Sequence, residues 1–541
     1  MNSRAISATA NGQARRCRFW LCCACLAVPA LMGGCARRAG EPISLVLMSP
    51  HRDEIREEFD LGFRDWFRER SEARLAAARA ALQTCLQHAD AAAVTAVQRA
   101  FADLFYDWRK DDLPELAALY GAWQEKPSRE SGTALLAGLD KWQQQLPPVQ
   151  LAWQDIGGGT SQIARYVDAR FQSHPEGIGI DFVFGGGTDI FLRFADQGRL
   201  ESIEMPAAIL GKRIPQQING IPLYDVKGRW YGPILSSFGI LYNREVLKRI
   251  RQPEPRRWAD LGEPGLYGWV SAGEPRMTGS VHMVYEIILQ GRGWEKGFQL
   301  LMRLGANTHT FIRDSGTLTR TVSGGEDAAA GVLDGFALSA VGRDPLNMAF
   351  WLPEGETLVN PDASAVLKGA PHKELARAFM EYSLSDAGQK LLLLQPGQPG
   401  GPRKHALCRL SVVPELYAQF PPEVRSVGAA NPFQLRNAIA YNSKLGNQRW
   451  DAVNDAIGAM IVDAHEDLAA AWKAVIGLPD TSARRAELEA TLFAPICSEK
   501  ELMTHARNIM EESPRVRTAM VNRWGETARQ RYRAVRLAAT R

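Results

Sequence analysis

Cysteine is scarce in this sequence, and the few cysteines present form no framework. Eight occur among 541 residues, and the three that follow the N-terminal segment, Cys85, Cys408 and Cys497, are odd in number and far apart. Their spacing matches neither a disulfide scaffold nor a cysteine-ligated metal centre. The other five lie close to the start of the chain: Cys17, Cys22, Cys23, Cys25 and Cys35.

The chain also lacks a charge excess once its N-terminal segment is set aside. Residues 1–34 contain four arginines and no acid, so the formal charge of +4 falls by four, to zero, for the remainder. No basic patch is patterned along the sequence, which argues against a nucleic-acid partner. After Cys35 no apolar stretch approaches the roughly 18 residues of a membrane-spanning helix.

The N-terminal segment itself is typical of a targeting signal. Basic residues precede an apolar stretch, Phe19–Met32, which is too short to span a bilayer. It ends in "LMGGC" (31–35), so we expect a lipoprotein signal peptide over 1–34, a lipid on Cys35 and a linker over 35–42. A simple cleaved signal with an incidental cysteine is the alternative. Either predicts a protein of the periplasm or cell envelope, and the first predicts a membrane anchor.

Hydrophobic patterning predicts alternating strands and helices. "ISLVLM" (43–48) is a continuous apolar run, typical of a buried parallel strand, and Ile55, Phe59, Phe63 and Phe67 then recur at helical spacing. Residues 69–148 are rich in Ala, Gln and charged residues and are expected to form a helical insertion. Strand–helix alternation then resumes, which indicates a mainly parallel α/β sheet.

Two long extended segments, 232–243 and 348–367, are expected to cross between two such units. We therefore predict a two-lobed α/β fold: 43–234 as the first part of lobe one, 235–350 as lobe two, 351–409 as the return to lobe one, and 410–541 as a helical C-terminal extension. The insertion and the extension are interpreted as scaffolding around lobe one, with a docking surface as the alternative.

Two glycine turns invite a nucleotide-binding interpretation, and the residues around them do not support it. "IGGGTS" (156–161) and "FGGGTD" (184–189) lack the Lys-Ser/Thr of a phosphate loop and the G-x-G-x-x-G spacing of a dinucleotide site. No nucleophile–base pair stands at a recognisable spacing. We therefore expect no enzyme activity, no cofactor and no catalytic or metal residues.

These turns can still serve a ligand. Glycine lets backbone N–H groups at a helix N-terminus approach an anion, and Ser or Thr adds a hydroxyl. One such turn is more often a plain helix cap, but four strand ends carry small polar residues: 49–51, 157–161, 185–189 and 278–280. In an open α/β sheet such ends converge on one crevice. Ser236 and Ser237 on the crossing segment are positioned to add hydroxyls.

Several stretches together resemble the extracellular solute-binding proteins of bacterial ABC importers, in the branch with ferric-iron, polyamine, thiamine and aminoethylphosphonate binders. They include "LVLMSPHRDEI" (45–55), 180–201, "YGPILSSFGILYNREVL" (231–247), 257–307 and 365–393. The resemblance implies a type II periplasmic-binding fold with the ligand held between the lobes. It also implies hinge closure and delivery to a membrane permease.

The resemblance also implies which residues face the ligand: Ser49, His51, Thr160, Ser161, Gly186, Gly187, Thr188, Ser237, Thr278, Gly279, Ser280 and Asp334. The chain departs from the family after Asp334, where Gly335 and Phe336 replace the usual aromatic residue and tyrosine. Ferric-iron members use tyrosine phenolates, so iron is disfavoured, with Tyr231 and Tyr242 as the remaining candidate ligands.

The expected function is therefore the substrate-binding component of an ABC transporter, acting as a monomer. Amide-rich helix starts favour a small anion such as phosphate, phosphonate or carboxylate. Asp189 and Asp334 would also suit an amine, so the ligand is expected to be anionic or zwitterionic. A sensor or assembly lipoprotein with the same fold is the alternative, and an extracytoplasmic hydrolase is the weaker one.

Overall fold

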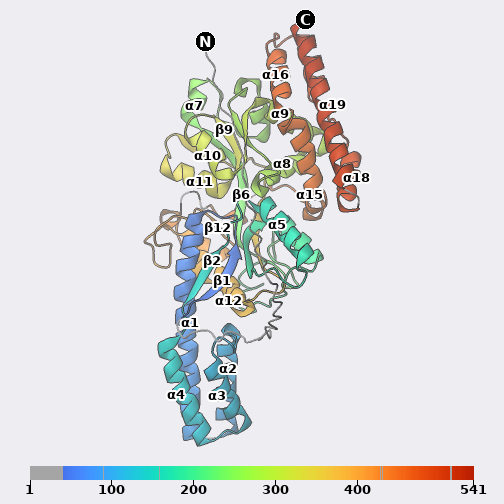
Figure 1. Cartoon of the computed structure of the whole chain (residues 1–541). Helices are drawn as coiled ribbons and strands as arrows, with labels where there is room; N and C mark the ends of the chain where they lie inside the picture. The colour runs from blue at the N-terminus through green and yellow to red at the C-terminus, as the bar shows by residue number, and fades with distance from the viewer. Residues whose placement is uncertain are drawn as a thin grey trace, which may run out of the picture. The chain divides into compact units, whose positions relative to one another are not determined.

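One long strand, β6 (Tyr231–Asn243), belongs to both halves of the molecule. Its first half pairs antiparallel with β11 (Val359–Val366), and its second half pairs antiparallel with β9 (Ala329–Leu333). The partner changes between Ser237 and Phe238. All 13 residues of β6 are buried, which agrees with its mainly apolar sequence. In Figure 1, β6 runs through the centre of the described fold.

This computed structural model describes residues 41–88, 90–157, 159–426, 428, 430–435, 437–511 and 514–541. The predicted signal peptide and Cys35 lie outside these residues. Gly40–Arg541 forms one compact unit. No helix in the described part of the chain is both long enough and apolar enough to span a membrane.

Each half of β6 organises one lobe. In lobe one the strand order is β2-β1-β3-β11-β6, and β1 (Ile43–Met48) is parallel to β2 (Val149–Trp153) and β3 (Phe182–Gly187). In lobe two the order is β6-β9-β7-β8, and β7 (Val270–Gly273) is parallel to β8 (Thr308–Ile312) and β9. The short strands β10 (Met348–Trp351) and β12 (Leu410–Ser411) also pair with β6. The predicted two-lobed α/β fold is confirmed, but the sheet is mixed and not mainly parallel, because β6 and β11 pair antiparallel with their neighbours.

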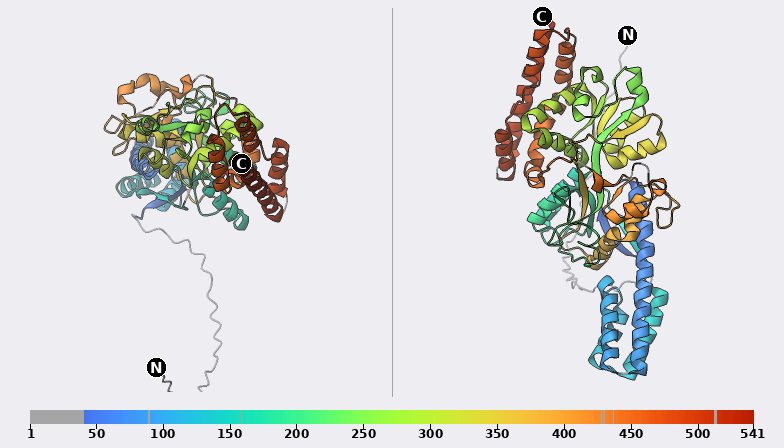
Figure 2. Two further views of the ribbon diagram at one scale, coloured as in Figure 1. Left: turned by 90° about the horizontal axis from the view of Figure 1, so that it is seen from above. Right: turned by 180° about the vertical axis from the view of Figure 1, so that it is seen from behind.

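Helices connect these strands and cover the sheets (Figures 1 and 2). Their bounds are α5 (Thr160–Ser173), α6 (Thr188–Asp196), α7 (Arg244–Arg249), α8 (Gly279–Arg292), α9 (Trp294–Asn307), α10 (Ser315–Ser323), α11 (Asp334–Arg343), α12 (Lys373–Leu384) and α13 (Asp386–Leu393). Three of them begin directly after the glycine-rich or hydroxyl-rich turns identified in the sequence, namely α5, α6 and α8.

The predicted helical insertion forms around one continuous helix. α1 (Asp53–Gln87) runs from lobe one into the insertion without a break at residue 69 and packs there with α2 (Ala91–Asp107), α3 (Pro114–Glu125) and α4 (Arg129–Gln145). Phe59, Phe63 and Phe67 hold its first half in the core of lobe one. Arg70 then binds both Asp107 of α2, at 2.7 Å, and Glu381 of α12, at 2.8 Å, which ties the insertion to the lobe.

The segment after residue 410 divides into two parts. β12 and α14 (Pro414–Gln419) stay in the core of lobe one. The helices that follow pack on the core of lobe two: α15 (Ser443–Ile457), a π-helical turn over Gly458–Val462, α16 (His465–Ile476), α17 (Ala483–Leu492), α18 (Glu499–Glu511) and α19 (Pro514–Thr540). The extension therefore packs mainly on lobe two, where Ala, Leu and Trp side chains bury its inner face, and not around lobe one as expected.

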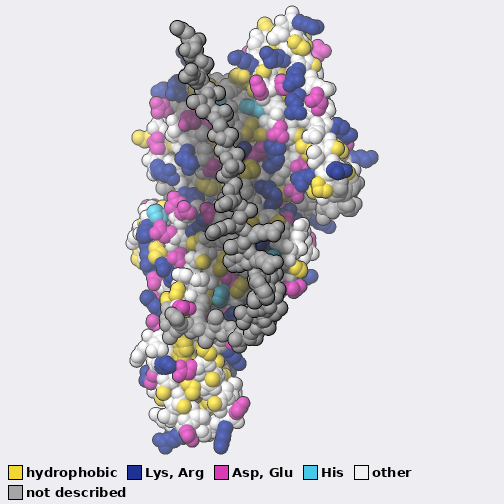
Figure 3. Space-filling view, viewed as in Figure 1, with side chains coloured by type: hydrophobic (Ala, Val, Ile, Leu, Met, Phe, Trp, Pro, Cys, Tyr) yellow, Lys and Arg dark blue, Asp and Glu magenta, His cyan; other side chains and the backbone are white. Residues whose placement is uncertain are grey.

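On the face shown in Figure 3, basic and acidic side chains are interspersed over the described surface. This mixture agrees with the near-neutral charge expected for the chain after residue 34. The described part of this face offers no extended basic track of the kind that nucleic-acid binding requires.

Candidate functional site

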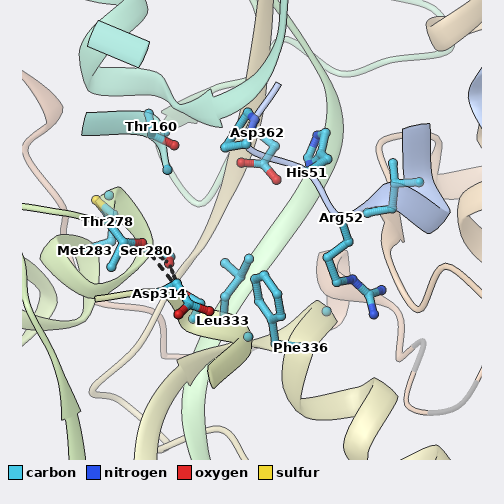
Figure 4. A pocket seen from close by; sticks show the side chains of 18 of the residues that line it. His51, Arg52, Thr160, Thr278, Ser280, Met283, Asp314, Leu333, Phe336 and Asp362 are labelled. Carbon is cyan, nitrogen blue, oxygen red and sulfur yellow. Dashed lines mark hydrogen bonds between the residues drawn. The ribbon is translucent and has the colours of Figure 1, made fainter. Parts of the chain in front are cut away.

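A cleft of about 390 Å³ lies where the two lobes meet. Phe238, the first β6 residue that pairs with lobe two, contributes to its wall, and the remaining lining residues come from both lobes. Figure 4 shows these side chains pointing into a common space. A volume of this size fits a small molecule better than a macromolecular segment.

Half of the twelve residues expected to face a ligand line this cleft. They are His51, Thr160, Gly187, Thr278, Gly279 and Ser280, and they come from four separate turns. The expectation that these strand ends converge on one crevice is therefore correct. The other six lie just behind the wall of the cleft: Ser49, Ser161, Gly186, Thr188, Ser237 and Asp334.

One end of the cleft is built from helix N-termini and hydroxyls. Gly159 and Thr278 precede α5 and α8, and among the described residues neither helix has a side-chain cap on its first turn. The first N–H groups of a helix have no acceptor within the helix, and its dipole favours an anion there. The hydroxyls of Thr278, Ser280 and Ser315 form a cluster, with Ser280 Oγ and Ser315 Oγ 2.8 Å apart.

The third glycine turn lets His51 approach the cleft. Gly185 and Gly186 at the end of β3 have φ values of +91° and +128°, which only glycine adopts readily. A Cβ on Gly185 would lie 2.2 Å from His51 Nε2. Burial lowers the pKa of His51 to about 3, so its ring is neutral at physiological pH. Its Nε2 has no hydrogen-bond partner within the described chain, although the side chain is buried and lines the cleft.

Two of the expected ligand residues instead support a buried arginine. Asp334 Oδ2 accepts hydrogen bonds from the backbone N–H of Ser237, at 2.7 Å, and from its hydroxyl, at 2.9 Å. Asp334 Oδ1 binds Arg409 Nη1 at 3.2 Å, and Arg409 also binds Asp362. Burial raises the pKa of Asp334 although Arg409 opposes it. Asp334 and Ser237 therefore hold the floor of the cleft and do not line it.

The remaining displaced hydroxyls have local partners or face inward. Thr188 donates to the carbonyl of Pro361 on β11, at 3.3 Å, and Ser49 Oγ accepts from the backbone N–H of His51, at 3.1 Å. Ser161 is buried on α5, and its hydroxyl has no partner among the described residues. A shift of one position along a turn was enough to direct a side chain into the protein interior.

Sequence reasoning missed the arginines of the cleft, Arg52, Arg56, Arg313 and Arg409. Arg52 occupies the N-cap position of α1, where Ser, Thr, Asp or Asn is usual. This unusual residue at a helix start could have indicated from the sequence that Arg52 has a role other than capping. Its guanidinium donates to Ser339 Oγ, at 2.8 Å, and to the carbonyl of Leu407, at 3.1 Å. It forms no ion pair within the described residues, and it lies 5.6 Å from the ring centre of Phe336.

The lining includes carboxylates as well, and each has a local partner. Asp362 binds Arg409, Asp155 accepts from the backbone N–H of Gly157, and Asp314 accepts from the N–H of Thr317 at the start of α10. Arg409 is matched by Asp334 and Asp362. Among the described residues, the lining cations that lack a buried carboxylate partner are therefore Arg52, Arg56 and Arg313. The described lining of the cleft holds four arginines and three carboxylates, and Asp155 and Asp314 pair there only with backbone N–H groups.

The tyrosines considered for iron point elsewhere. The Tyr231 hydroxyl donates to the carbonyl of Ile203, at 2.5 Å, and the Tyr242 hydroxyl donates to Glu254, at 2.7 Å. No tyrosine is among the described residues that line the cleft. The described part of the chain also contains no group of three or more His, Cys, Asp or Glu side chains able to hold a metal ion.

Two α/β lobes, joined by crossing strands around a small-molecule cleft, define the periplasmic binding protein fold. The solved structure of the periplasmic binding protein P5PA has this fold. It is 17% identical to this chain, covers 77% of it and 99% of its own chain, and superposes with a TM-score of 0.50.

Residues 178–405 match the model of the family described as bacterial extracellular solute-binding protein. The phosphoglycerate transport regulatory protein PgtC of Salmonella typhimurium is 28% identical over 214 residues, which cover 39% of this chain and 51% of PgtC. An uncharacterized protein of Haemophilus influenzae is 27% identical and is covered over 60% of its length. The chain thus spans about half the length of PgtC.

Proposed function

We propose that this protein captures a small phosphorylated organic acid in the extracytoplasmic space. The observation that carries the proposal is the two-ended character of the cleft. One end presents helix N-termini and the Thr278, Ser280 and Ser315 hydroxyls, and the other presents Arg52. In Figure 4, Arg52 lies on the opposite side of the pocket from Thr278 and Ser280.

The first end suits a phosphoryl group. Phosphate oxygens accept several hydrogen bonds at once, and uncapped helix N-termini supply N–H donors with a favourable dipole. The starts of α5 and α8 converge here, since a Cβ on Gly279 would lie 3.0 Å from Thr160 Cβ. Hydroxyls and amides contribute these donors without the desolvation cost of a buried cation.

The second end suits a carboxylate. Burial lowers the pKa of Arg52, which means that the charged guanidinium is poorly solvated where it lies. Its hydrogen bonds to Ser339 and Leu407 go to neutral acceptors. A carboxylate would supply the missing charge through a charge-assisted hydrogen bond, worth about 1.5–3 kcal/mol. Neutral His51, between the two ends, is suited to a hydroxyl.

Delivery and signalling are the two candidate uses of the captured solute. The match to the solute-binding family favours delivery to an ABC permease, with the protein held at the membrane by a lipid on Cys35. The name of PgtC, a transport regulatory protein for phosphoglycerate, favours the second use, in which the loaded receptor reports the solute to a membrane partner. Both uses require the same cleft and no turnover.

We expect thermal-shift and calorimetry measurements to show the highest affinity for ligands that carry both a phosphate and a carboxylate. 3-Phosphoglycerate should bind most tightly, glycerol 3-phosphate and glycerate more weakly, and ferric citrate not at all. Ligand at about 100 times its dissociation constant should stabilise the protein by about 2.7 kcal/mol. Binding of none of the phosphorylated compounds, or preferential binding of polyamines or thiamine, would refute the proposal.

Arg52→Gln is expected to weaken binding of 3-phosphoglycerate by about 10- to 150-fold, which corresponds to the loss of about 1.5–3 kcal/mol. Its affinity for glycerol 3-phosphate should change little, since that ligand lacks the carboxylate. Arg343→Gln is the matched control, because Arg343 is exposed, contributes to the electrostatics at Arg52 and does not line the cleft. Equal weakening of both ligands by Arg52→Gln would contradict a carboxylate subsite at this residue.

A further inference from the structure

The C-terminal extension makes a contact that bridges the two lobes outside the cleft. α15 packs on lobe two through Ala452, Val453 and Ile457, and it also lies against α6 of lobe one. Arg193 of α6 and Asp451 of α15 form an ion pair of 3.6 Å at the edge of this contact. Any opening of the cleft that separates the lobes must therefore slide or break the α6–α15 interface.

A carboxyl group is buried at the centre of this interface. Asp189, in the first turn of α6, is only 2% exposed. Its Oδ2 lies 3.4 Å from the hydroxyl of Tyr441, just before α15, and its Oδ1 has no partner among the described residues. Gly446 of α15 faces it so closely that a Cβ there would lie 3.2 Å from Oδ1 and 2.4 Å from the Tyr441 hydroxyl.

The charged groups around Asp189 do not neutralise it. The charge of Glu286 on α8 acts on Asp189, and Glu286 is itself held by Arg449 of α15, at 2.8 Å. Arg449 also binds Glu499. On its own helix, Arg193 is directed to Asp451 and to Asp168 of α5. Burial and, to a lesser extent, Glu286 raise the pKa of Asp189 to about 7, while the Tyr441 hydrogen bond opposes the rise.

The interface also touches the wall of the cleft. The Tyr441 hydroxyl lies 3.6 Å from Met283 Sδ, and Met283 lines the cleft from α8. One helical turn after Gly446 in α15, the Trp450 ring stacks on the His282 ring of α8, and the two ring centres are 3.6 Å apart. A Cβ on Gly279, at the start of α8, would lie 3.4 Å from the Trp450 ring. The contact of α15 with α6 is thus continuous with the helix start that forms the phosphoryl end of the cleft.

We propose that Asp189 and Tyr441 form a proton-sensitive latch that holds the two lobes together around the captured solute. Protonated Asp189 fits the dry α6–α15 interface as a neutral group. Ionised Asp189 favours separation of the lobes, because water then solvates the charge. This inference rests on the proposed capture of a solute between the lobes, and it assigns to the C-terminal extension a role in the regulation of that capture.

The sign of the pH dependence follows from linkage. In the latched form the pKa of Asp189 is about 7, whereas a solvated Asp has a pKa of about 3.9. The latched form therefore binds the proton more tightly. The equilibrium constant for the latched form over the form with separated lobes is highest below about pH 4. It falls by up to about tenfold per pH unit between about pH 4 and pH 7, and it stays constant above about pH 7. Solute release is favoured in neutral surroundings and capture in acidic ones.

The test is the dissociation constant of 3-phosphoglycerate, measured by calorimetry from about pH 5 to pH 8.5 for wild type and Asp189→Asn. The phosphate group titrates in the same range, with a pKa near 6, but its effect cancels in the ratio of the two constants. We expect the wild-type constant, divided by that of Asp189→Asn, to rise by about tenfold or more up to pH 7 and then level off. Asp196→Asn, which removes an exposed carboxylate from the same helix, should leave the wild-type profile unchanged.

A second measurement needs no solute and keeps both Asp189 and Tyr441. Spin labels on two exposed positions, 176 in lobe one and 346 in lobe two, report the distance between the lobes. The short-distance population should decline as the pH rises towards 7. A ratio and a distance distribution that are both independent of pH would overturn the latch while leaving solute binding intact. If none of the phosphorylated acids binds, but the distance between the two spin labels still changes with pH, the proposed function is refuted and the latch is not.

Discussion

Replacement of Arg409 by methionine is expected to lower the free energy of unfolding by about 3–5 kcal/mol, as is usual when one partner is removed from a buried ion pair. Arg409 is 2% exposed and binds both Asp334 and Asp362. Asp334 is 1% exposed and would keep only its hydrogen bonds from Ser237 and Gly335. The measurement is urea unfolding at neutral pH, where an uncompensated carboxylate is most costly.

Two further variants separate this effect from a general loss of packing. Asp334→Asn combined with Arg409→Met should recover part of the lost stability, because the double variant leaves no buried charge at Asp334. Arg403→Gln removes an arginine of the same return segment that is 56% exposed and paired with Asp65. It should change stability by at most about 1 kcal/mol. If Arg409→Met lowers the free energy of unfolding no more than Arg403→Gln does, the ion pairs of Arg409 with Asp334 and Asp362 contribute little to stability.

The elements of the fold were readable from sequence because each has a local signature. The apolar run of β1, the four-residue spacing of Phe59, Phe63 and Phe67, and the glycine turns before α5 and α6 are all short-range patterns. The long extended segment 232–243 likewise indicated a strand that crosses between the two lobes, and β6 is that strand. Such patterns depend only on neighbours within a few positions, so the local structure that they predict is also found in the folded chain.

The chemistry of the cleft was harder to predict because it depends on pairs that are distant in sequence. Arg409 meets Asp334 across 75 positions, and Tyr441 meets Asp189 across 252. The hydroxyls of Thr160 and Thr188 follow equivalent turns, yet only the first faces the cleft. Thr160 begins α5 after a turn that separates it from β2, whereas Thr188 follows β3 directly and donates to Pro361 of the neighbouring β11, a contact distant in sequence.

The second large effect is expected from Gly185→Ala. At a φ of +91° a side chain is strained by about 1–2 kcal/mol, and the new Cβ would lie 2.2 Å from His51 Nε2. Overpacking of a tightly filled site adds about 1–3 kcal/mol, so the total loss of unfolding free energy is expected to be about 2–5 kcal/mol. Solute affinity should fall as well, because His51 can relieve the contact only by moving towards the cleft that it lines.

Gly198→Ala is the matched control for this substitution. Gly198 has a φ of +66°, and no atom of the described residues outside its immediate chain neighbours lies within 4 Å of the position of a Cβ there. It should therefore show the backbone strain alone, about 1–2 kcal/mol, with solute affinity unchanged. Equal losses of stability in the two variants would mean that the His51 ring moves freely, and the affinity for 3-phosphoglycerate would then report whether its place in the cleft matters. Wild-type stability and affinity in the Gly185→Ala variant would show that neither the close approach of β3 to His51 nor the positive φ at this position requires glycine.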